Sequence, residues 1–248
     1  MTMKLTVLGM YGGYPYHDVG TSAYLLQTAN YNLLLDCGSG ALLSLQHHLD
    51  PLQLDAVLLS HYHHDHIADV GVLQYYWQLH QGHKKESVLP IYGHTADPLH
   101  FAALTMQGIT QGKAYQAQHK STIGPFDITF LPTVHPVPAY AMRIVERDSG
   151  KTLVYTADTA YFDALPQFAR RADLLITDTN FLKRKTGTIM HMTTTQSGLL
   201  AKDAAVKSLL ISHLPQTVDF KKLKTETEVA TGPDIPVTVA QKDLQLTL

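Results

Sequence analysis

The chain has 248 residues, of which 45% are hydrophobic and 16% charged, and 19 Lys and Arg stand against 21 Asp and Glu. These values are typical of a globular protein, and the net charge of -2 is not that of a protein that binds long nucleic acids. No apolar stretch approaches the ~18 residues of a membrane span, and a single cysteine, Cys37, excludes an intramolecular disulfide. We therefore expect a cytoplasmic protein that forms one domain over residues 1–248 and has no membrane partner.

The first half of the chain predicts strands separated by helices. Residues 4–8 predict a strand rather than a signal peptide, because the long apolar core of a signal is absent. Further strands are predicted at residues 23–28, 32–35, 56–59 and 89–92, and helices at residues 40–48, 67–81 and 97–106.

The second half repeats this pattern. Strands are predicted at residues 126–131, 140–145, 153–155, 174–177 and 209–211, and β-type residues fill 237–248. A turn at residues 148–150 joins two of these strands as a hairpin, and helices are predicted at residues 194–203 and 219–230. Because strands occur in mixed groups between helices, the pattern indicates an α/β or α+β fold without choosing between them.

The loop after the strand at residues 56–59 carries the densest group of candidate metal ligands. His61, His63, Asp65 and His66 fall within six positions, and a tight loop allows such side chains to converge. Neutral imidazoles bind Zn²⁺ at roughly 2.0–2.1 Å. His61 and His63 could serve one ion while Asp65 and His66 serve a second. The alternative is a polar loop in a protein that is rich in histidine, with 15 in all.

Three later strands are followed by further candidate ligands. His135, Asp158 and His213 each lie a few residues beyond the end of a predicted strand, as His61 does. Side chains presented from several strand ends at one rim of a sheet are a common way to build an active site. Any one of them alone would be an ordinary loop residue, but the repeated placement favours a metal centre.

In this order, the motifs resemble those of the metallo-β-lactamase superfamily and, within it, the ribonuclease Z-like group. The resemblance runs from Leu5 to the C-terminal strand, and it implies a four-layer αββα sandwich. Ala157 stands where the family usually has glycine. The resemblance implies a first metal bound by His61, His63 and His135, a second bound by Asp65, His66 and His213, and Asp158 as the bridge between them.

Two residues are candidates for a catalytic role. Two cations ~3.5–4 Å apart can share a bridging water and lower its pKa towards 7. Asp65 could take the proton of that water or simply fix the second metal. The resemblance also implies that the His-x-Thr segment at His191 supplies a histidine near a scissile phosphate, where a protonated ring could protonate the leaving oxygen. The alternative is that His191 is a solvent-exposed residue beside the helix N-cap, which is predicted at Thr193 or Thr194.

These observations predict a hydrolase with two divalent metal ions, Zn²⁺ in the first place or else Mn²⁺, and most simply a phosphodiesterase. A lactone, thioester or other carboxylic ester is the alternative substrate, and an inactive metal-stabilised binding protein is the non-enzymatic alternative. The stretch between His135 and Asp158 already holds two predicted strands and leaves no room for an RNA-binding arm. The expected partner is therefore a small anionic phosphodiester or nucleotide rather than a long RNA, and a homodimer is compatible with the sequence.

Other residues near the motifs receive simpler predictions. Asp36 could orient a ligand histidine or form a turn before Cys37, which we expect to be a buried thiol. The glycines of the segment 11–15 would allow its backbone to approach the site closely. The remaining histidines are predicted to be surface or loop residues: His17, His47, His48, His64, His80, His83, His94, His100 and His119.

Overall fold

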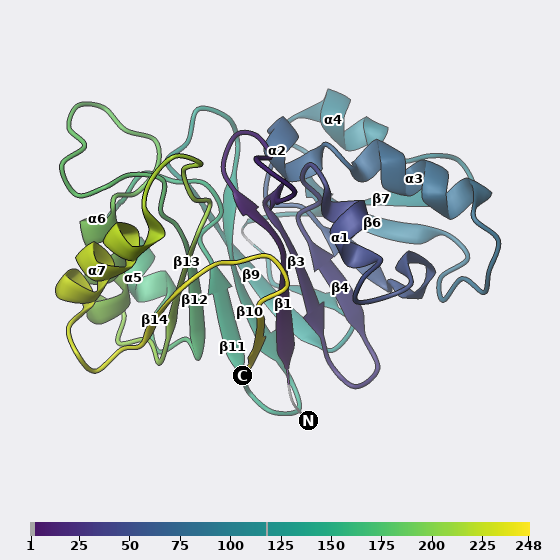
Figure 1. Ribbon diagram of the computed structural model, residues 1–248. Helices are drawn as coiled ribbons and strands as arrows, with labels where there is room; N and C mark the ends of the chain where they lie inside the picture. Colours follow the sequence, from purple (N-terminus) through teal and green to yellow (C-terminus); the bar gives the residue numbers. More distant parts are fainter. Residues whose placement is uncertain (1–2, 118) are drawn as a thin grey trace.

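Two β-sheets face each other in the computed structural model, which describes residues 3–117 and 119–248, and helices cover their outer faces (Figure 1). The first sheet has the strand order β15 (Gln245–Thr247), β1 (Lys4–Tyr11), β3 (Ala23–Gln27), β4 (Asn32–Leu35), β5 (Ala56–Leu58), β6 (Leu89–His94) and β7 (Thr110–Tyr115), with β2 (Gly20–Thr21) beside β1. The second has the order β14 (Val237–Val239), β13 (Leu209–Ser212), β12 (Leu174–Asp178), β11 (Thr152–Tyr155), β10 (Tyr140–Glu146), β9 (Phe126–Pro132) and β8 (Ser121–Ile123).

The helices form the two outer layers of the sandwich (Figure 1). The first sheet is covered by α1 (Ala41–Leu45), α2 (His64–Ile67), α3 (Val70–Leu79) and α4 (Pro98–Ala103), and a 3₁₀ turn follows α1 at Pro51–Gln53. The second sheet is covered by α5 (Leu165–Phe168), α6 (Thr194–Asp203) and α7 (Phe220–Thr231). This is the αββα arrangement that the resemblance implied. None of the helices in the described ranges is long and apolar enough to cross a membrane.

The hydrophobic core follows the alternation of side chains along the strands. In β3, Tyr24 and Leu26 belong to the cluster between the two sheets, whereas Ala23 and Leu25 belong to the cluster between the first sheet and its helices. Successive side chains of a strand point to opposite faces, so a strand that is apolar throughout is buried on both. The helix-side cluster is completed by Trp77 of α3, which is fully buried.

Parallel pairing brings the functional ends of the strands to one edge of the sandwich. β4, β5 and β6 pair in parallel in the first sheet, and β11, β12, β13 and β14 do so in the second. The carboxyl ends of parallel strands lie at the same edge of a sheet. The residues that follow β4, β5, β11 and β13 therefore meet, although they are far apart in the sequence.

The structure differs from the predicted elements in several places. The helix predicted at residues 67–81 is split between α2 and α3 at Asp69, whose carboxylate accepts a hydrogen bond from the Leu42 amide. The strands β7 and β8 and the short helix α5 were not predicted; β7 and β8 are the last strands of their sheets, and such edge strands can be polar. The C-terminal segment forms two strands in different sheets, because β15 returns to pair with β1.

Candidate metal centre

The histidine-rich segment, residues 61–66, follows β5 in the chain. His61 and His63 lie in the turn after this strand, and Asp65 and His66 lie on the short helix α2, whose first turn is closed by the bond from the His66 amide to the His63 carbonyl. His61 and His66 are fully buried, whereas His64 is exposed and points away as predicted. The turn thus directs four side chains inward.

A first group of ligand atoms meets at one point. The Nδ1 atom of His63 lies 3.2 Å from Nε2 of His61 and 2.9 Å from Nε2 of His135. Together with a carboxylate oxygen of Asp158, these ligand atoms all lie within 4.8 Å of one another. Burial lowers the pKa of all three imidazoles, and that of His61 falls well below its ordinary value. Neutral imidazole is the form that binds a metal, so this group fits a divalent cation.

A second group shares Asp158 with the first. Nε2 of His213 lies 3.1 Å from Oδ2 of Asp65 and 3.2 Å from Oδ2 of Asp158, and Nε2 of His66 lies 3.2 Å from Oδ1 of Asp158. His66 Nε2 and Asp158 Oδ1 are nonetheless buried without a hydrogen-bond partner among the described residues. Buried polar atoms are rarely left in this way, and a cation between them would satisfy both. The seven predicted ligands are therefore brought together in two groups.

The charges of the second group show how strongly it needs positive charge. Burial by itself would raise the pKa of Asp158, but His213 and His66 lower it to well below the ordinary value. Burial would lower the pKa of His213, but the carboxylates of Asp158 and Asp178 raise it well above the ordinary value. Protons on these histidines and a bound cation are alternative ways to balance the same buried carboxylates.

Residues 18–203 match the family model of the metallo-beta-lactamase superfamily. The chain belongs to this superfamily. It is 46% identical over 237 residues to the probable metallo-hydrolase YhfI of Bacillus subtilis, covering 95% of this chain and 96% of that protein. The crystal structure of YhfI superposes with a TM-score of 0.93 at 44% identity over 99% of both chains.

More distant structures share the fold of this superfamily. The short form of human tRNase Z superposes with a TM-score of 0.72 at 19% identity, over 98% of both chains. A diphosphatase of the PhnP family gives a TM-score of 0.73 at 17% identity, over 98% of this chain and 97% of that one. The resemblance predicted from the sequence is confirmed. Family and sequence relatives together support a metal-dependent hydrolase, and the two groups of His and Asp fit the divalent metals that this superfamily binds.

Asp36 orients one of the candidate ligands of this superfamily member. Its carboxylate accepts hydrogen bonds from Nδ1 of His66 at 2.8 Å, from the Ser60 amide at 2.7 Å and from the Tyr155 hydroxyl at 2.9 Å. The hydroxyl of Ser60 donates a fourth bond at 2.8 Å. A carboxylate on the far nitrogen of a ligand histidine fixes its tautomer and its direction. Of the two predictions made for Asp36, the orienting role matches the structure.

Asp178 plays the corresponding part in the second sheet and was not predicted. It ends β12, and its carboxylate accepts a bond from Nδ1 of His213 at 3.2 Å, one from Nδ1 of His191 at 2.7 Å and one from the Thr159 amide at 3.0 Å. The sequence did hold a signal, because Asp178 directly follows the predicted strand at residues 174–177. It stands at a strand end as the other site residues do.

His191 faces the two groups from one side. Its ring is stacked on that of His213 at 5.0 Å with an interplanar angle of 22°, and its side chain is 23% exposed. Burial would lower its pKa, but the hydrogen bond to Asp178 and the charge of that carboxylate raise it. Thr193 is the N-cap of α6 and forms a capping box with Gln196, so His191 takes no part in the cap. The structure therefore places the ring beside the ligand groups and not in open solvent.

Three strand-end residues adopt a backbone conformation that favours glycine. Asp36 has φ 54°, Ala157 has φ 51° and His213 has φ 53°. Left-handed conformations cost a residue with a Cβ roughly 1–2 kcal/mol, and such strain collects at functional sites. The superfamily's usual glycine at the position of Ala157 therefore has a physical reason. In this chain the backbone of Ala157 is strained.

The glycines of the first loop approach the site closely, as predicted. The Gly13 amide donates a hydrogen bond to Oδ2 of Asp65 at 2.7 Å. A Cβ atom added at Gly12 would lie 2.5 Å from Cε1 of His213, so only glycine allows the loop to pack against this ring. The loop thus helps to hold Asp65 and His213.

One of the histidines predicted to be at the surface is buried. His94 is only 2% exposed, because β6 extends to it and the rings of Tyr62, Tyr115 and Tyr140 pack around it. The prediction was wrong for this residue. Cys37 is buried, in agreement with its prediction as a structural thiol.

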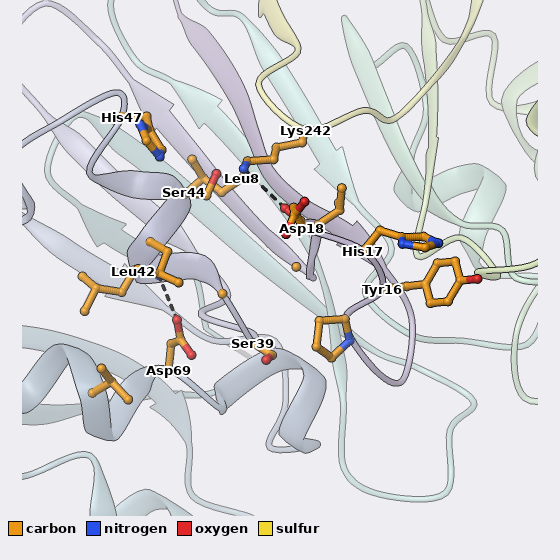
Figure 2. Close-up of a pocket in the computed structure, with 16 residues that line it drawn as sticks. Leu8, Tyr16, His17, Asp18, Ser39, Leu42, Ser44, His47, Asp69 and Lys242 are labelled. Atoms are coloured by element: carbon orange, nitrogen blue, oxygen red, sulfur yellow. Dashed lines mark hydrogen bonds between the residues drawn. The ribbon is translucent and has the colours of Figure 1, made fainter.

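A large cavity lies apart from the two ligand groups. It has a volume of about 900 Å³ and lies between α1, the loop of Tyr16 and Asp18, and Lys242 (Figure 2). None of the seven candidate ligands lines it. Size alone therefore does not identify the functional site of this protein.

Proposed function

We propose that the protein is a phosphodiesterase that acts on a small phosphodiester or nucleotide with two divalent metal ions, Zn²⁺ or else Mn²⁺. The observation that carries this proposal is His191, which faces both ligand groups while its Nδ1 is held by Asp178 at 2.7 Å. Hydrolysis of a phosphodiester has to protonate an alkoxide leaving group, and a histidine held in this way is suited to that step.

The candidate ligands divide into two sites with one shared carboxylate. Asp158 would hold both ions, since it belongs to both groups of ligand atoms. When bound, two such ions supply a nucleophile at neutral pH and neutralise charge on the phosphoryl oxygens. The first ion would be held by His61, His63 and His135, and the second by Asp65, His66 and His213.

Asp65 fits the role of a ligand better than that of a base. Burial would raise its pKa, but the hydrogen bond from His213 and the charge of His66 hold it below the ordinary value. An effective general base has a pKa near the working pH, and this carboxylate is far from it. Of the two predicted roles for Asp65, we propose that it fixes the second metal.

His191 fits the role of a general acid. Its pKa is raised, so the protonated form persists to higher pH than for an ordinary histidine. Nδ1 is occupied by Asp178, which leaves Nε2 to hold the transferable proton and to donate it to the leaving oxygen. Asp178 stabilises the imidazolium before the transfer and keeps the ring in position.

The distant structural neighbours agree with chemistry at phosphorus. One is named a transfer-RNA nuclease and the other a diphosphatase, so both by name cleave bonds to phosphorus. At 19% and 17% identity they support the analogy of fold only, and the site has to carry the argument.

A small substrate suits this chain better than a long RNA. The segment between His135 and Asp158 is occupied by β10, a turn and β11. Lys and Arg number 19 against 21 Asp and Glu, whereas neutralising many phosphates requires clustered basic residues.

The proposal is tested by metal analysis combined with a substrate panel. We expect two equivalents of transition metal and hydrolysis of bis-(p-nitrophenyl) phosphate with a higher kcat/KM than that of any lactone or thioester. Faster hydrolysis of a lactone or thioester would replace the proposal with the carboxylic-ester alternative. A metal-loaded protein that hydrolyses none of these substrates would indicate the binding-protein alternative.

A further inference from the structure

A small cavity adjoins the first ligand group. It has a volume of about 180 Å³, and His63 forms part of its wall. Tyr62 and His64, which flank His63, and Val137 and Pro138, which follow His135, also line it. One proposed metal ligand, His63, thus lines the cavity, and a second, His135, is separated from the lining residue Val137 only by Pro136. A substrate whose reacting group lies at the metal centre would therefore be able to extend into this cavity.

Aromatic rings form one wall of this cavity. The ring of Tyr62 is buried and fixed by the bond from its hydroxyl to the His94 carbonyl at 2.6 Å. The ring of His100 is stacked on it at 5.6 Å with an interplanar angle of 16°, and that of His94 lies 4.3 Å away. Planar aromatic side chains of this kind bind the faces of nucleobases.

His94 brings hydrogen-bonding groups to the wall of the cavity that are not fully used. It is 2% exposed, and neither Nδ1 nor Nε2 has a well-aligned hydrogen bond to the described residues, although the ring approaches the Pro138 carbonyl. Burial lowers its pKa to about 4, although the Asp97 carboxylate and the Pro138 carbonyl oppose this shift. The ring is therefore neutral and offers one donor and one acceptor. Buried polar atoms without partners require an explanation, and a ligand supplies one.

The dimensions select a single ring system as the occupant. Cavities for drug-sized ligands measure about 300–1,000 Å³, so 180 Å³ holds only a part of a nucleotide. The occupant has to be small and planar to fit beside Tyr62, and it needs a donor or an acceptor on its edge to pair with one ring nitrogen of His94. A nucleobase has these three properties.

We propose that this cavity is the subsite for the nucleobase of a nucleotide substrate, and that His94 determines which base is accepted. This inference rests on the proposed phosphodiesterase activity. The phosphodiester would lie at the two ligand groups, and the ribose would span His63. The pair of Asp97 and His100, joined at 2.7 Å, would form the outer rim.

The test compares nucleotides with a phosphodiester that has no base. Cyclic purine and pyrimidine nucleotides and methyl p-nitrophenyl phosphate are assayed with the metal-loaded full chain. We expect the wild type to prefer at least one nucleotide, and His94→Leu to reduce this preference about 10- to 100-fold, mainly through KM. His94→Gln, which keeps a donor and an acceptor, should restore part of the loss.

Two further variants guard against a simple loss of structure. His100→Ala changes a half-exposed ring and should raise KM for the nucleotide several-fold through lost stacking. His80→Leu is the matched control, because His80 is likewise stacked on a tyrosine, Tyr76, but on the exposed face of α3. We expect this control to leave the preference unchanged.

The outcomes separate the two proposals. If phosphodiesters are hydrolysed but His94→Leu and His100→Ala lower the rates on all of them equally, the subsite is refuted and the phosphodiesterase stands. If the wild type shows no preference for any nucleotide, the subsite is refuted as well. If the metal-loaded wild type hydrolyses no phosphodiester, both proposals fall together.

Discussion

Asp36 and Asp178 are both buried carboxylates that hold a candidate metal ligand, but they do so in different surroundings. Asp36, behind β4 in the first sheet, accepts bonds from Ser60, His66 and Tyr155, all of them buried. Asp178, at the end of β12 in the second sheet, accepts bonds from His213 and from His191, whose side chain is 23% exposed. The partners of Asp36 therefore all lie in the core, whereas Asp178 connects a candidate ligand to a partly exposed ring.

The two sheets therefore contribute to the site in different ways. The first sheet supplies a compact set of candidate ligands from one turn, and the buried carboxylate of Asp36 holds one of them, His66. The second sheet supplies ligands singly, from separate strand ends, together with the residue that we propose to act on the substrate. If the two sheets have different roles, a treatment that abolishes both roles should have the largest effect on activity.

Removing the metals should have the largest effect. Because both ligand groups would lose the ions that polarise the substrate, we expect activity to fall by at least ~10⁴-fold, or ~5.5 kcal/mol. The measurement is phosphodiester hydrolysis after dialysis against a chelator, with metal content determined in parallel. Restoring Zn²⁺ or Mn²⁺ should restore the rate, whereas full activity in metal-free protein would contradict the metal centre.

His191→Ala should have the second-largest effect on activity. It should remove only the role that we propose for the second sheet. Loss of a general acid lowers kcat by roughly 10²–10⁴-fold, while the metal content should stay at the wild-type value because His191 is in neither proposed ligand set. Steady-state kinetics and elemental analysis of the same preparation check this. An unchanged kcat would remove His191 from the mechanism.

Asp178→Asn and Asp36→Asn form a matched pair. Each removes a charge from behind a ligand histidine, so each should weaken metal binding by roughly 10–100-fold. Only Asp178→Asn should also lower kcat when metal is saturating, since it alone releases His191. Equal kcat losses in both variants would show that the two carboxylates are equivalent after all.

The same pair predicts a difference in pH dependence. Burial lowers the pKa of His191, and Asp178 raises it by more, so the protonated acid should be lost only as the pH rises through this raised value. Removing the charge of Asp178 lowers that pKa, and the alkaline decline of kcat should therefore move to lower pH in Asp178→Asn. Asp36→Asn should leave the decline in place. A profile of kcat against pH for the three proteins makes the comparison.

Tyr155→Phe should have the smallest effect. It removes one of the four hydrogen bonds on Asp36 in a fully buried position, and a bond to a charged group contributes about 1.5–3 kcal/mol. We expect the free energy of unfolding to fall by this amount, measured by urea denaturation, with kcat nearly unchanged at saturating metal. A large loss of kcat without loss of stability would mean that the first sheet also takes part in the reaction.

Much of the fold and of the site could be predicted because their signals are local. The strands at 32–35 and 140–145 are apolar or alternating runs bounded by turns, and the helix at residues 194–203 begins at a capping residue. The turn of His61, His63 and His66 places its ligands within a few residues of one another. Features that depend only on residues close together in the sequence can be predicted from that sequence.

The seven candidate ligands, their positions after apolar runs and the family of the chain could all be inferred from the order of residues. The residues that support these ligands from behind and from the side became apparent only in the folded chain. The bonds of Asp36 to Tyr155 and of Asp178 to His213 join residues 119 and 35 positions apart, and β15 pairs with β1 across the whole chain. His94 looked like a surface histidine until tyrosines from two other strands covered it. Such contacts depend on which strand ends meet at the edge of the sandwich, and no periodicity along the chain records that.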